Sequence, residues 1–513
     1  MQMVKSLDTE AFKITPTENV DNNIDISDRL SALPECVLLH ILSLLDTKEA
    51  AITSCLSTRW RHLFLSLRDI DLCFSVKHDA SDSDCARLFH LFIQFVDRVL
   101  QQRNKEPIRK IQFRVNYFIE GFRSGFESLL MSTATAISDY KVESLDIFVE
   151  MDKTTAELCF VTIPPGIFSS ESLVYLLLNL RVGWKVPEFV WLPNLKYFQL
   201  ISFILMDEDS IHRLLKHCPS LEHLELIVWS LVKSESENEN ENAEGKQLDA
   251  LRVSSPSLKR LGLIWDDKVE SDFNVIVESE NLEDFECSLE GRHKVTLGAP
   301  NLKTLVISGQ MLEVDITQRL VSIDEAMIEA NFPCHLTNMD DFSSRVQQAF
   351  KFFSRLQRVK SLSLSENIMK ALYASLPLMP TFGNLIKLEL IPEYCLSFPR
   401  LSILQVLLKL FENSPNLEVL IFNEVFDNYF GEDEEIDHVV PLTFVEHLKE
   451  IEISNFKGGE IEFKMVEYFL KNGKSLEKIT LDREGWESKP NHYNRILSFK
   501  KCSEDCQIVF RKK

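Results

Sequence analysis

One six-residue pattern recurs along most of this 513-residue chain and limits its possible folds more than any other feature. A leucine-like residue is followed by two variable residues, a second apolar residue, a variable residue and a third apolar residue. Because the last two apolar residues are two positions apart, they share one face of a short strand. Clear copies begin at Leu173, Leu195, Leu221, Leu258, Leu282, Leu302, Val359, Leu385, Leu417, Leu448 and Leu476, and weaker copies begin at Ile108 and Val142.

The spacing of these copies indicates a repeat array. Most neighbouring copies start 20 to 37 residues apart, and the wider interval between Leu302 and Val359 leaves room for a degenerate copy. Two intervals also hold apolar residues at helical spacing, before Pro219 and before Pro415. These are Ile211, Leu214, Leu215 and Cys218 in the first, and Ile403, Val406, Leu407, Leu410 and Phe411 in the second. The pattern resembles leucine-rich repeats, which implies strand and helix units stacked into a curved solenoid with a parallel sheet on its concave face.

The amino-terminal part has a different pattern, which predicts three short helices. Pro34 suits the first turn of a helix, where its missing N–H costs nothing. Asp46 and Glu49 suit the start of a second helix, and Ser57 the start of a third that carries Trp60. Leu38, Ile41, Leu42 and Leu45 fall at i, i+3, i+4 and i+7 on one face of the first helix.

So small a helical unit cannot bury all its apolar side chains, so some of them either meet a larger core or bind a partner. The ordered run of residues from Leu33 to Leu63 resembles an F-box, with departures at Asp46, Ala51 and Phe64. This resemblance implies binding to the Skp-type adaptor of a cullin–RING ubiquitin ligase. The adaptor-binding residues that it implies are Leu33, Pro34, Glu35, Leu38, Ile41, Leu42, Leu45, Leu56, Arg59 and Trp60.

The carboxyl-terminal segment predicts a strand, a helix that ends at Gly473 and another strand. It is similar to the FBD domain that follows leucine-rich repeats in many plant F-box proteins, and it also suits the terminal cap of the array. The predicted organisation is therefore α/β throughout. It comprises a disordered lead (residues 1–26), the F-box (27–68), the repeat solenoid (69–440, with an acidic loop at 234–246) and the FBD-like segment (441–513).

Charge argues against nucleic acid and membranes as partners. The chain has 78 Asp and Glu against 56 Lys and Arg, a net charge of −22, which repels phosphate backbones and anionic lipids. The acidic runs at 234–246 and 432–437 suit loops extended by self-repulsion, or a contact for a basic partner. We expect no signal peptide, and no apolar run approaches the roughly 20 residues of a membrane-spanning helix.

Signals for catalysis and cofactors are missing from the sequence. No G-x-G-x-x-G or G-x-x-x-x-G-K-[ST] motif is present, so we expect no nucleotide cofactor. The eleven cysteines form no C-x-x-C pair and suit reduced thiols of a cytoplasmic or nuclear protein. A possible metal cluster at His212, His217, Cys218 and His223 is better explained by the repeat pattern, so we expect no metal.

The sequence therefore favours a non-catalytic substrate receptor, in which the F-box binds the adaptor and the repeats hold a target for ubiquitination. One alternative is an interaction scaffold without a role in a ubiquitin ligase. Another is a sensor that needs a small molecule for target binding. The target is unknown, although variable strand positions such as Gln199, Glu225, Lys303, Ser363 and Glu389 are candidates for the concave surface.

Overall fold

A computed structural model describes most of the chain, which divides into two compact units, Met1–Tyr197 and Phe198–Lys513. The described residues are 30, 33–76, 81–103, 106–118, 120–151, 161–184, 186–204, 208–229, 250–266, 273–289, 293–310, 313–331, 347, 350–373, 376–392, 403–423, 446–483 and 491–512. The predicted lead at 1–26 and the acidic runs at 234–246 and 432–437 lie outside these residues. No helix in the described part is long and apolar enough to cross a membrane.

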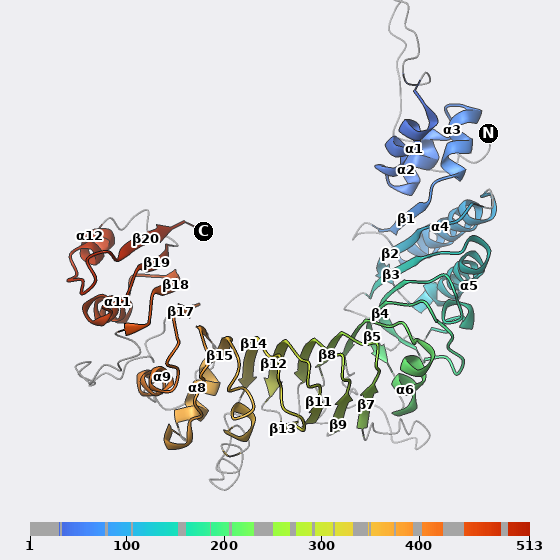
Figure 1. The fold of residues 1–513 in the computed structure, drawn as a ribbon. Coiled ribbons are helices and arrows are strands. Elements are labelled where there is room, and N and C mark those ends of the chain that lie inside the picture. Colours follow the sequence, from blue (N-terminus) through green and yellow to red (C-terminus); the bar gives the residue numbers. More distant parts are fainter. Residues whose placement is uncertain are drawn as a thin grey trace, which may run out of the picture. The chain divides into compact units, whose positions relative to one another are not determined.

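The first unit begins with three short helices and continues into a parallel sheet (Figure 1). Its elements are α1 (Glu35–Ser43), α2 (Thr47–Thr53), α3 (Thr58–Leu65), β1 (Asp69–Phe74), α4 (Asp82–Gln101), β2 (Lys110–Phe118), η1 (Glu120–Phe122), α5 (Arg123–Tyr140), β3 (Ser144–Met151), η2 (Pro165–Ile167) and β4 (Tyr175–Trp184). Strands β1 to β4 pair in chain order, each parallel to the next. The weak copies at Ile108 and Val142 thus do form strands. Strand β1 carries the same pattern in Leu67-Arg-Asp-Ile-Asp-Leu72, a copy that the sequence analysis missed.

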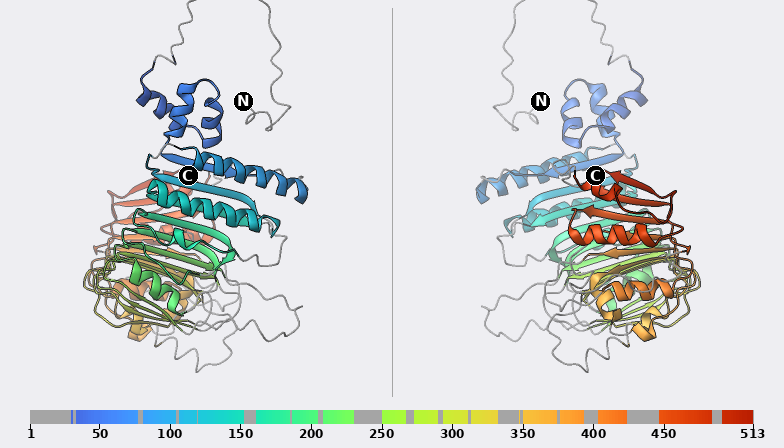
Figure 2. Two further views of the ribbon diagram at one scale, coloured as in Figure 1. Left: turned by 90° about the vertical axis from the view of Figure 1, so that its right-hand side faces the viewer. Right: turned by 90° about the vertical axis from the view of Figure 1, so that its left-hand side faces the viewer.

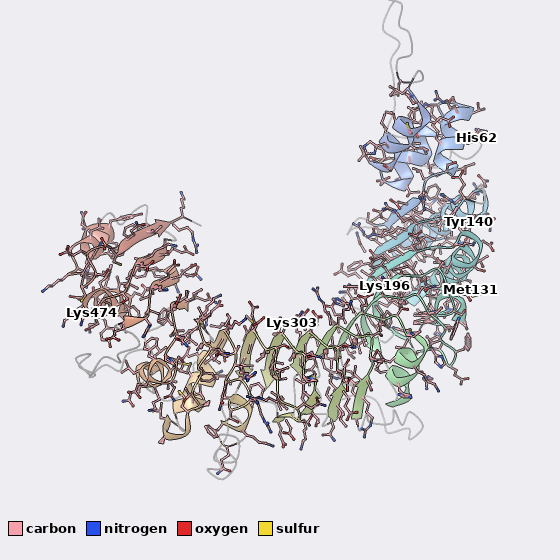
Figure 3. The ribbon with its side chains drawn as sticks, viewed as in Figure 1. His62, Met131, Tyr140, Lys196, Lys303 and Lys474 are labelled. Atoms are coloured by element: carbon pink, nitrogen blue, oxygen red, sulfur yellow. The ribbon has the colours of Figure 1, made fainter. Side chains whose placement is uncertain are left out.

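Helices α4 and α5 run alongside the strands of this unit and bury their apolar sides against them (Figure 2). Aromatic rings fill this interior: Phe89 stacks on Phe122 with centroids 4.3 Å apart, and Phe74 meets both rings edge-on. At the end of α5 the hydroxyl of Tyr140, labelled in Figure 3, donates to the carbonyl of Leu100 at 2.7 Å. The two helices and the sheet therefore form one core.

The second unit holds a long parallel sheet in which nearly every strand is a predicted copy of the pattern. Its strands are β5 (Tyr197–Ile204), β6 (His223–Trp229), β8 (Arg260–Asp266), β10 (Asp284–Leu289), β12 (Thr304–Gln310), β14 (Glu325–Asn331), β15 (Ser361–Ser365), β16 (Lys387–Ile391), β17 (Val419–Phe422), β18 (Glu450–Phe456), β19 (Lys478–Arg483) and β20 (Gln507–Arg511). The degenerate copy expected between Leu302 and Val359 is β14, and Ile323 begins it as a buried residue. Strand β20 was not predicted.

Within the second unit the long sheet lies on the inner side of an arc and other elements cover its outer side (Figure 1). The covering helices are α6 (Glu208–His217), α8 (Glu366–Tyr373), α9 (Ile403–Glu412), α11 (Glu460–Asn472) and α12 (Asn491–Leu497). Helices α6 and α9 occupy the two intervals in which the sequence predicts a helix, so this part of the prediction is confirmed.

Between α6 and α8 a second sheet replaces the expected helices, which corrects the strand–helix unit predicted there. This sheet pairs β7 (Ala250–Ser254), β9 (Asn274–Glu278), β11 (Lys294–Gly298) and β13 (Glu313–Ile316), all parallel. The intervals before the copies at Leu258, Leu282 and Leu302 each hold a short alternating apolar segment, and none of these segments has apolar residues at helical spacing. Alternating β-branched segments such as Asn-Val-Ile-Val-Glu in β9 suit a strand instead.

Polar side chains at the strand starts hold neighbouring repeats in register. The amides of Asn281 and Asn301 donate to carbonyls of the preceding repeat, at Pro256 (2.7 Å) and Glu280 (2.9 Å). The residue just before most strands of the second unit is charged, with exceptions at Ile386 before β16 and Cys506 before β20, and acidic and basic residues at these positions pair across neighbouring strands. The pairs are Glu222–Lys259 (2.8 Å), Glu283–Lys303 (2.7 Å), Asp324–Lys360 (2.6 Å) and Glu418–Lys449 (2.9 Å).

The carboxyl-terminal elements follow the predicted order of strand, helix and strand in β18, α11 and β19. Gly473 ends α11 as expected, with its N–H donating to the carbonyl of Phe469. Glu462 is buried at the start of the helix and accepts the N–H groups of Lys457 (2.9 Å) and Gly459 (2.6 Å). The strand–helix–strand segment is therefore continuous with the repeats and adds its strands to the same sheet.

Candidate functional site

The amino-terminal helices form the first candidate site, and local caps explain their limits. Pro34 directly precedes α1 and its carbonyl accepts the N–H groups of Val37 and Leu38. The carboxylate of Asp46 accepts the N–H of Glu49 at 2.7 Å and so starts α2. The hydroxyl of Ser57 accepts the N–H of Trp60 at 3.3 Å and starts α3. The three helices and the Asp46 and Ser57 caps are thus as the sequence predicts, and α1 begins one residue after Pro34.

Three of the ten predicted adaptor-binding residues lie in the interior of this unit. Leu38 and Leu42 are fully buried, and Trp60 is almost fully buried. Their side chains cannot contact a partner without unfolding the helices. The resemblance implies that Leu38, Leu42 and Trp60 contact the adaptor, whereas in the structure these residues pack α1 against α3.

Other apolar side chains of the unit face solvent instead. Leu56, one of the predicted residues, is 68% exposed, although a leucine side chain is usually buried. Leu44 and Ile52 are 73% and 58% exposed and were missed by the sequence analysis. The signal for Leu44 was its position outside the face of α1 that Leu38 and Leu42 define, whereas Ile52 lies in α2 and had no such signal. These three side chains form an exposed apolar set at the ends of α1 and α2.

The remaining predicted residues lie at or near the surface. Pro34 and Glu35 are exposed, whereas Leu33, Ile41, Leu45 and Arg59 are partly exposed. The guanidinium of Arg59 donates to the carbonyl of Leu33 at 2.8 Å and ties α3 to the segment before α1. Arg59 therefore has at least one structural role in the unit.

Two contacts join the helical unit to the first repeat. The hydroxyl of Thr47 accepts the N–H of Asp71 in β1 at 2.7 Å. The guanidinium of Arg103, which is 7% exposed, donates to the carbonyl of Leu67 just after α3. Burial lowers the pKa of Arg103 to about 10, so the side chain still carries its proton at neutral pH. The helices are therefore fixed to the sheet of the first unit through both the backbone and a buried cation.

The inner face of the second unit is the other candidate site, and the structure places the five named positions on it or at its border. Gln199 donates to the carboxylate of Glu225 at 2.7 Å, and Ser363 donates to Glu389 at 3.1 Å. Lys303 lies just before β12, at the inner margin of the sheet in Figure 3, and pairs with Glu283. The four positions within strands thus lie on the inner face as the sequence predicted, and Lys303 lies at its margin. The role of these five residues in target binding stays a prediction.

The possible metal ligands are not brought together. His212 and His217 lie in α6, the buried Cys218 directly follows this helix, and His223 begins β6. Burial raises the pKa of Cys218 to about 12 and lowers that of His223. Among the described residues no group of three His, Cys, Asp or Glu side chains could hold a metal ion.

Comparison with known proteins agrees with these features. Family models match for the F-box domain (residues 30–71), the LRR repeats of FBD-associated F-box protein At5g56370 (134–389) and FBD (435–481). F-box/LRR-repeat protein At4g14096 of Arabidopsis thaliana is 30% identical over 88% of this chain and 87% of its own length. F-box/FBD/LRR-repeat protein At1g13780 of the same plant is 28% identical over 94% of this chain and 98% of its own length.

Proposed function

Because this chain belongs to the F-box/LRR-repeat proteins of plants and also carries an FBD domain, we propose that it is a substrate-receptor subunit of a Skp–cullin–F-box ubiquitin ligase. In this role the F-box binds a Skp-type adaptor, and the adaptor binds a cullin. The repeats hold a target protein, which other subunits ubiquitinate. We also propose a cytoplasmic or nuclear location, on the basis of the cysteine usage.

The exposed apolar set of Leu44, Ile52 and Leu56 carries this proposal. Fully burying a leucine or isoleucine side chain contributes about 1.5 to 3 kcal/mol, so leaving three of them in water is costly for a unit this small. An adaptor that covers them would recover part of that free energy on binding. The buried residues Leu38, Leu42 and Trp60 hold the helices that present the set.

The contribution of the chain to ubiquitin transfer is positional. A target held on a rigid sheet presents its lysines near the conjugating enzyme at high effective concentration. The anchoring of α2 and α3 through Thr47 and Arg103 suits this role, because it fixes the F-box to the first repeats. No residue of this chain needs to form a covalent intermediate.

Substitution of the exposed set tests the proposal. The full chain carrying Ile52→Glu and Leu56→Glu should lose co-purification with a co-expressed Skp-type adaptor, because carboxylates would be buried in the interface. The matched control is Leu497→Glu at the end of α12, since Leu497 is also 59% exposed but lies in the FBD-like segment. Adaptor binding that survives the double substitution, or that is lost equally with the control, would contradict the proposal.

A further inference from the structure

An apolar pair of side chains lies on the inner face of the second unit, where β10, β12 and β14 run side by side (Figure 1). The register of these strands places Val306 between Glu286 and Met327. Val306 and Met327 are partly exposed, at positions where a solvated strand usually carries polar residues. The alternate residues of β12 and β14 point to the core and are buried, namely Leu305, Ile307, Ala326 and Ile328.

Three carboxylates surround this apolar pair. Glu325 and Glu329 lie two residues before and two residues after Met327 on β14, so they share its face of the sheet. Glu286 lies beside Val306 on β10. Within the described part of the chain, none of the three carboxylates joins an ion pair or accepts a hydrogen bond. They therefore form a negative border around an apolar centre.

Glu329 is less exposed than the other two carboxylates. Burial, together with the nearby Glu389, raises the pKa of its carboxyl group. Glu389 itself is held by the hydroxyl of Ser363 (3.1 Å), the amide of Asn423 (3.0 Å) and the ammonium group of Lys387 (3.4 Å). Because Glu329 has no such cation among the described residues, a positive group placed beside it would stabilise its charged form.

A buried hydroxyl next to Glu329 also lacks a hydrogen-bond partner. The register that aligns Ile328 with Leu364 brings Glu329 level with Ser365. Ser365 lies two residues after Ser363 on the same face of β15 and is completely buried. Its oxygen makes no hydrogen bond to the described residues, although buried hydroxyl groups usually have a partner. Glu329 and Ser365 thus offer acceptors for a donor from outside the described chain.

The spacing along β14 defines which segment would match these groups. Side chains two residues apart on a strand are about 6.6 Å apart, and an extended segment lying along β14 has the same repeat. Its residues i, i+2 and i+4 would therefore come opposite Glu325, Met327 and Glu329. Basic residues at i and i+4 would make charge-assisted contacts with the two carboxylates. An aliphatic residue at i+2 would cover Met327 and Val306.

We propose that this face binds an extended segment of the target protein with basic residues at i and i+4 and an aliphatic residue at i+2. Since the pattern is symmetric, it matches the face in either chain direction. Glu286 adds a third negative charge beside the aliphatic residue and disfavours acidic segments. The inference rests on the proposed function and specifies the chemistry of its substrate.

A defined peptide tests the inference without any adaptor. A blocked, fluorescein-labelled peptide with the order Arg, Ser, Leu, Ser, Arg between glycines should bind the full chain in a fluorescence anisotropy titration. Glu325→Gln/Glu329→Gln should weaken this binding by about tenfold, because two charge-assisted contacts are lost. A peptide of the same composition in the order Leu, Ser, Arg, Arg, Ser should bind the wild-type chain more weakly, because its adjacent arginines point to opposite sides.

A matched control separates a specific site from general charge attraction. Glu278→Gln/Glu280→Gln removes the same number of charges from exposed carboxylates at the end of β9 and just after it, in the second sheet and its following turn. The affinity of this variant for the first peptide should stay within about twofold of wild type. Equal weakening by both double variants, equal binding of the reordered peptide, or no binding of the first peptide would overturn the inference.

Both double variants should still bind the Skp-type adaptor, since their substitutions lie in the second unit. Retained adaptor binding with no peptide recognition would refute this binding face and leave the proposed function standing. Peptide recognition by a chain that binds no adaptor would refute the proposed function and leave the binding face standing.

Discussion

Replacing Gly309 by alanine should open the long sheet locally between β10 and β12. Gly309 has a φ of 100°, a conformation that L-residues rarely adopt, and it lies directly opposite Leu289. An added Cβ would overlap the carbonyl oxygen of Leu289 and lie 2.9 Å from its carbonyl carbon. The conformation alone costs about 1 to 3 kcal/mol. Displacing the strand loses further hydrogen bonds at about 0.5 to 1.5 kcal/mol each. A total of about 3 to 5 kcal/mol follows from these terms.

Hydrogen exchange read by mass spectrometry measures this effect in the full chain, where a single unfolding midpoint is poorly defined. Amides of β10 and β12 that exchange by local opening should exchange at least about 100-fold faster in Gly309→Ala, because 1.4 kcal/mol corresponds to a factor of ten. Gly383→Ala is the control, since no atom lies within 4 Å of its added Cβ, and its exchange should be unchanged or slightly slower. Unchanged exchange of β10 and β12 in Gly309→Ala would refute the reasoning.

Two further substitutions test the junction and the response to pH. Arg103→Ala should lower the free energy of unfolding of the first unit by about 2 to 4 kcal/mol, because the carbonyl of Leu67 loses its buried donor and a cavity remains. Urea denaturation, followed by protease cleavage at residues 66–69, measures this loss of stability. Cleavage at the same urea concentration as in wild type would contradict the prediction. Burial lowers the pKa of His223, so below pH 6.5 the unfolded chain takes up the proton first and stability falls. His223→Gln should therefore lose less local stability than wild type between pH 8 and pH 5, as measured by hydrogen exchange of the β6 amides corrected for their intrinsic exchange rates, and an equal loss would contradict this cause.

The repeated strands could be predicted because the six residues of each copy contain the apolar pattern that makes it a strand. The three apolar residues of a copy point inward wherever the strand lies in the sheet, so the pattern is independent of distant contacts. The copies at Leu221 and Leu258, for example, became β6 and β8 in direct register. The helices α6 and α9 were equally clear, since their apolar residues recur at helical spacing and a proline follows.

The second sheet could not be predicted in the same way. Segments such as Ala250–Ser254 and Lys294–Gly298 are only five residues long and become strands because each of them pairs with β9. That pairing depends on the stacking of successive repeats, which no single copy reveals. Strand β20 is similar, since it is fixed by its pairing with β19 at the end of the sheet.

The candidate site shows the same division between local and tertiary information. The caps at Asp46 and Ser57 are local and were predicted. The exposure of Leu44 and the burial of Trp60 depend on how the three helices pack, so a motif match alone does not distinguish residues that contact a partner from residues that support the surface.

The composition of a reconstituted complex tests the central claim most directly. The full chain, a purified Skp-type adaptor and the amino-terminal part of a cullin should elute together, and light scattering should give the mass of a 1:1:1 assembly. Elution of an adaptor–cullin complex separate from this chain would contradict its assignment as a substrate receptor.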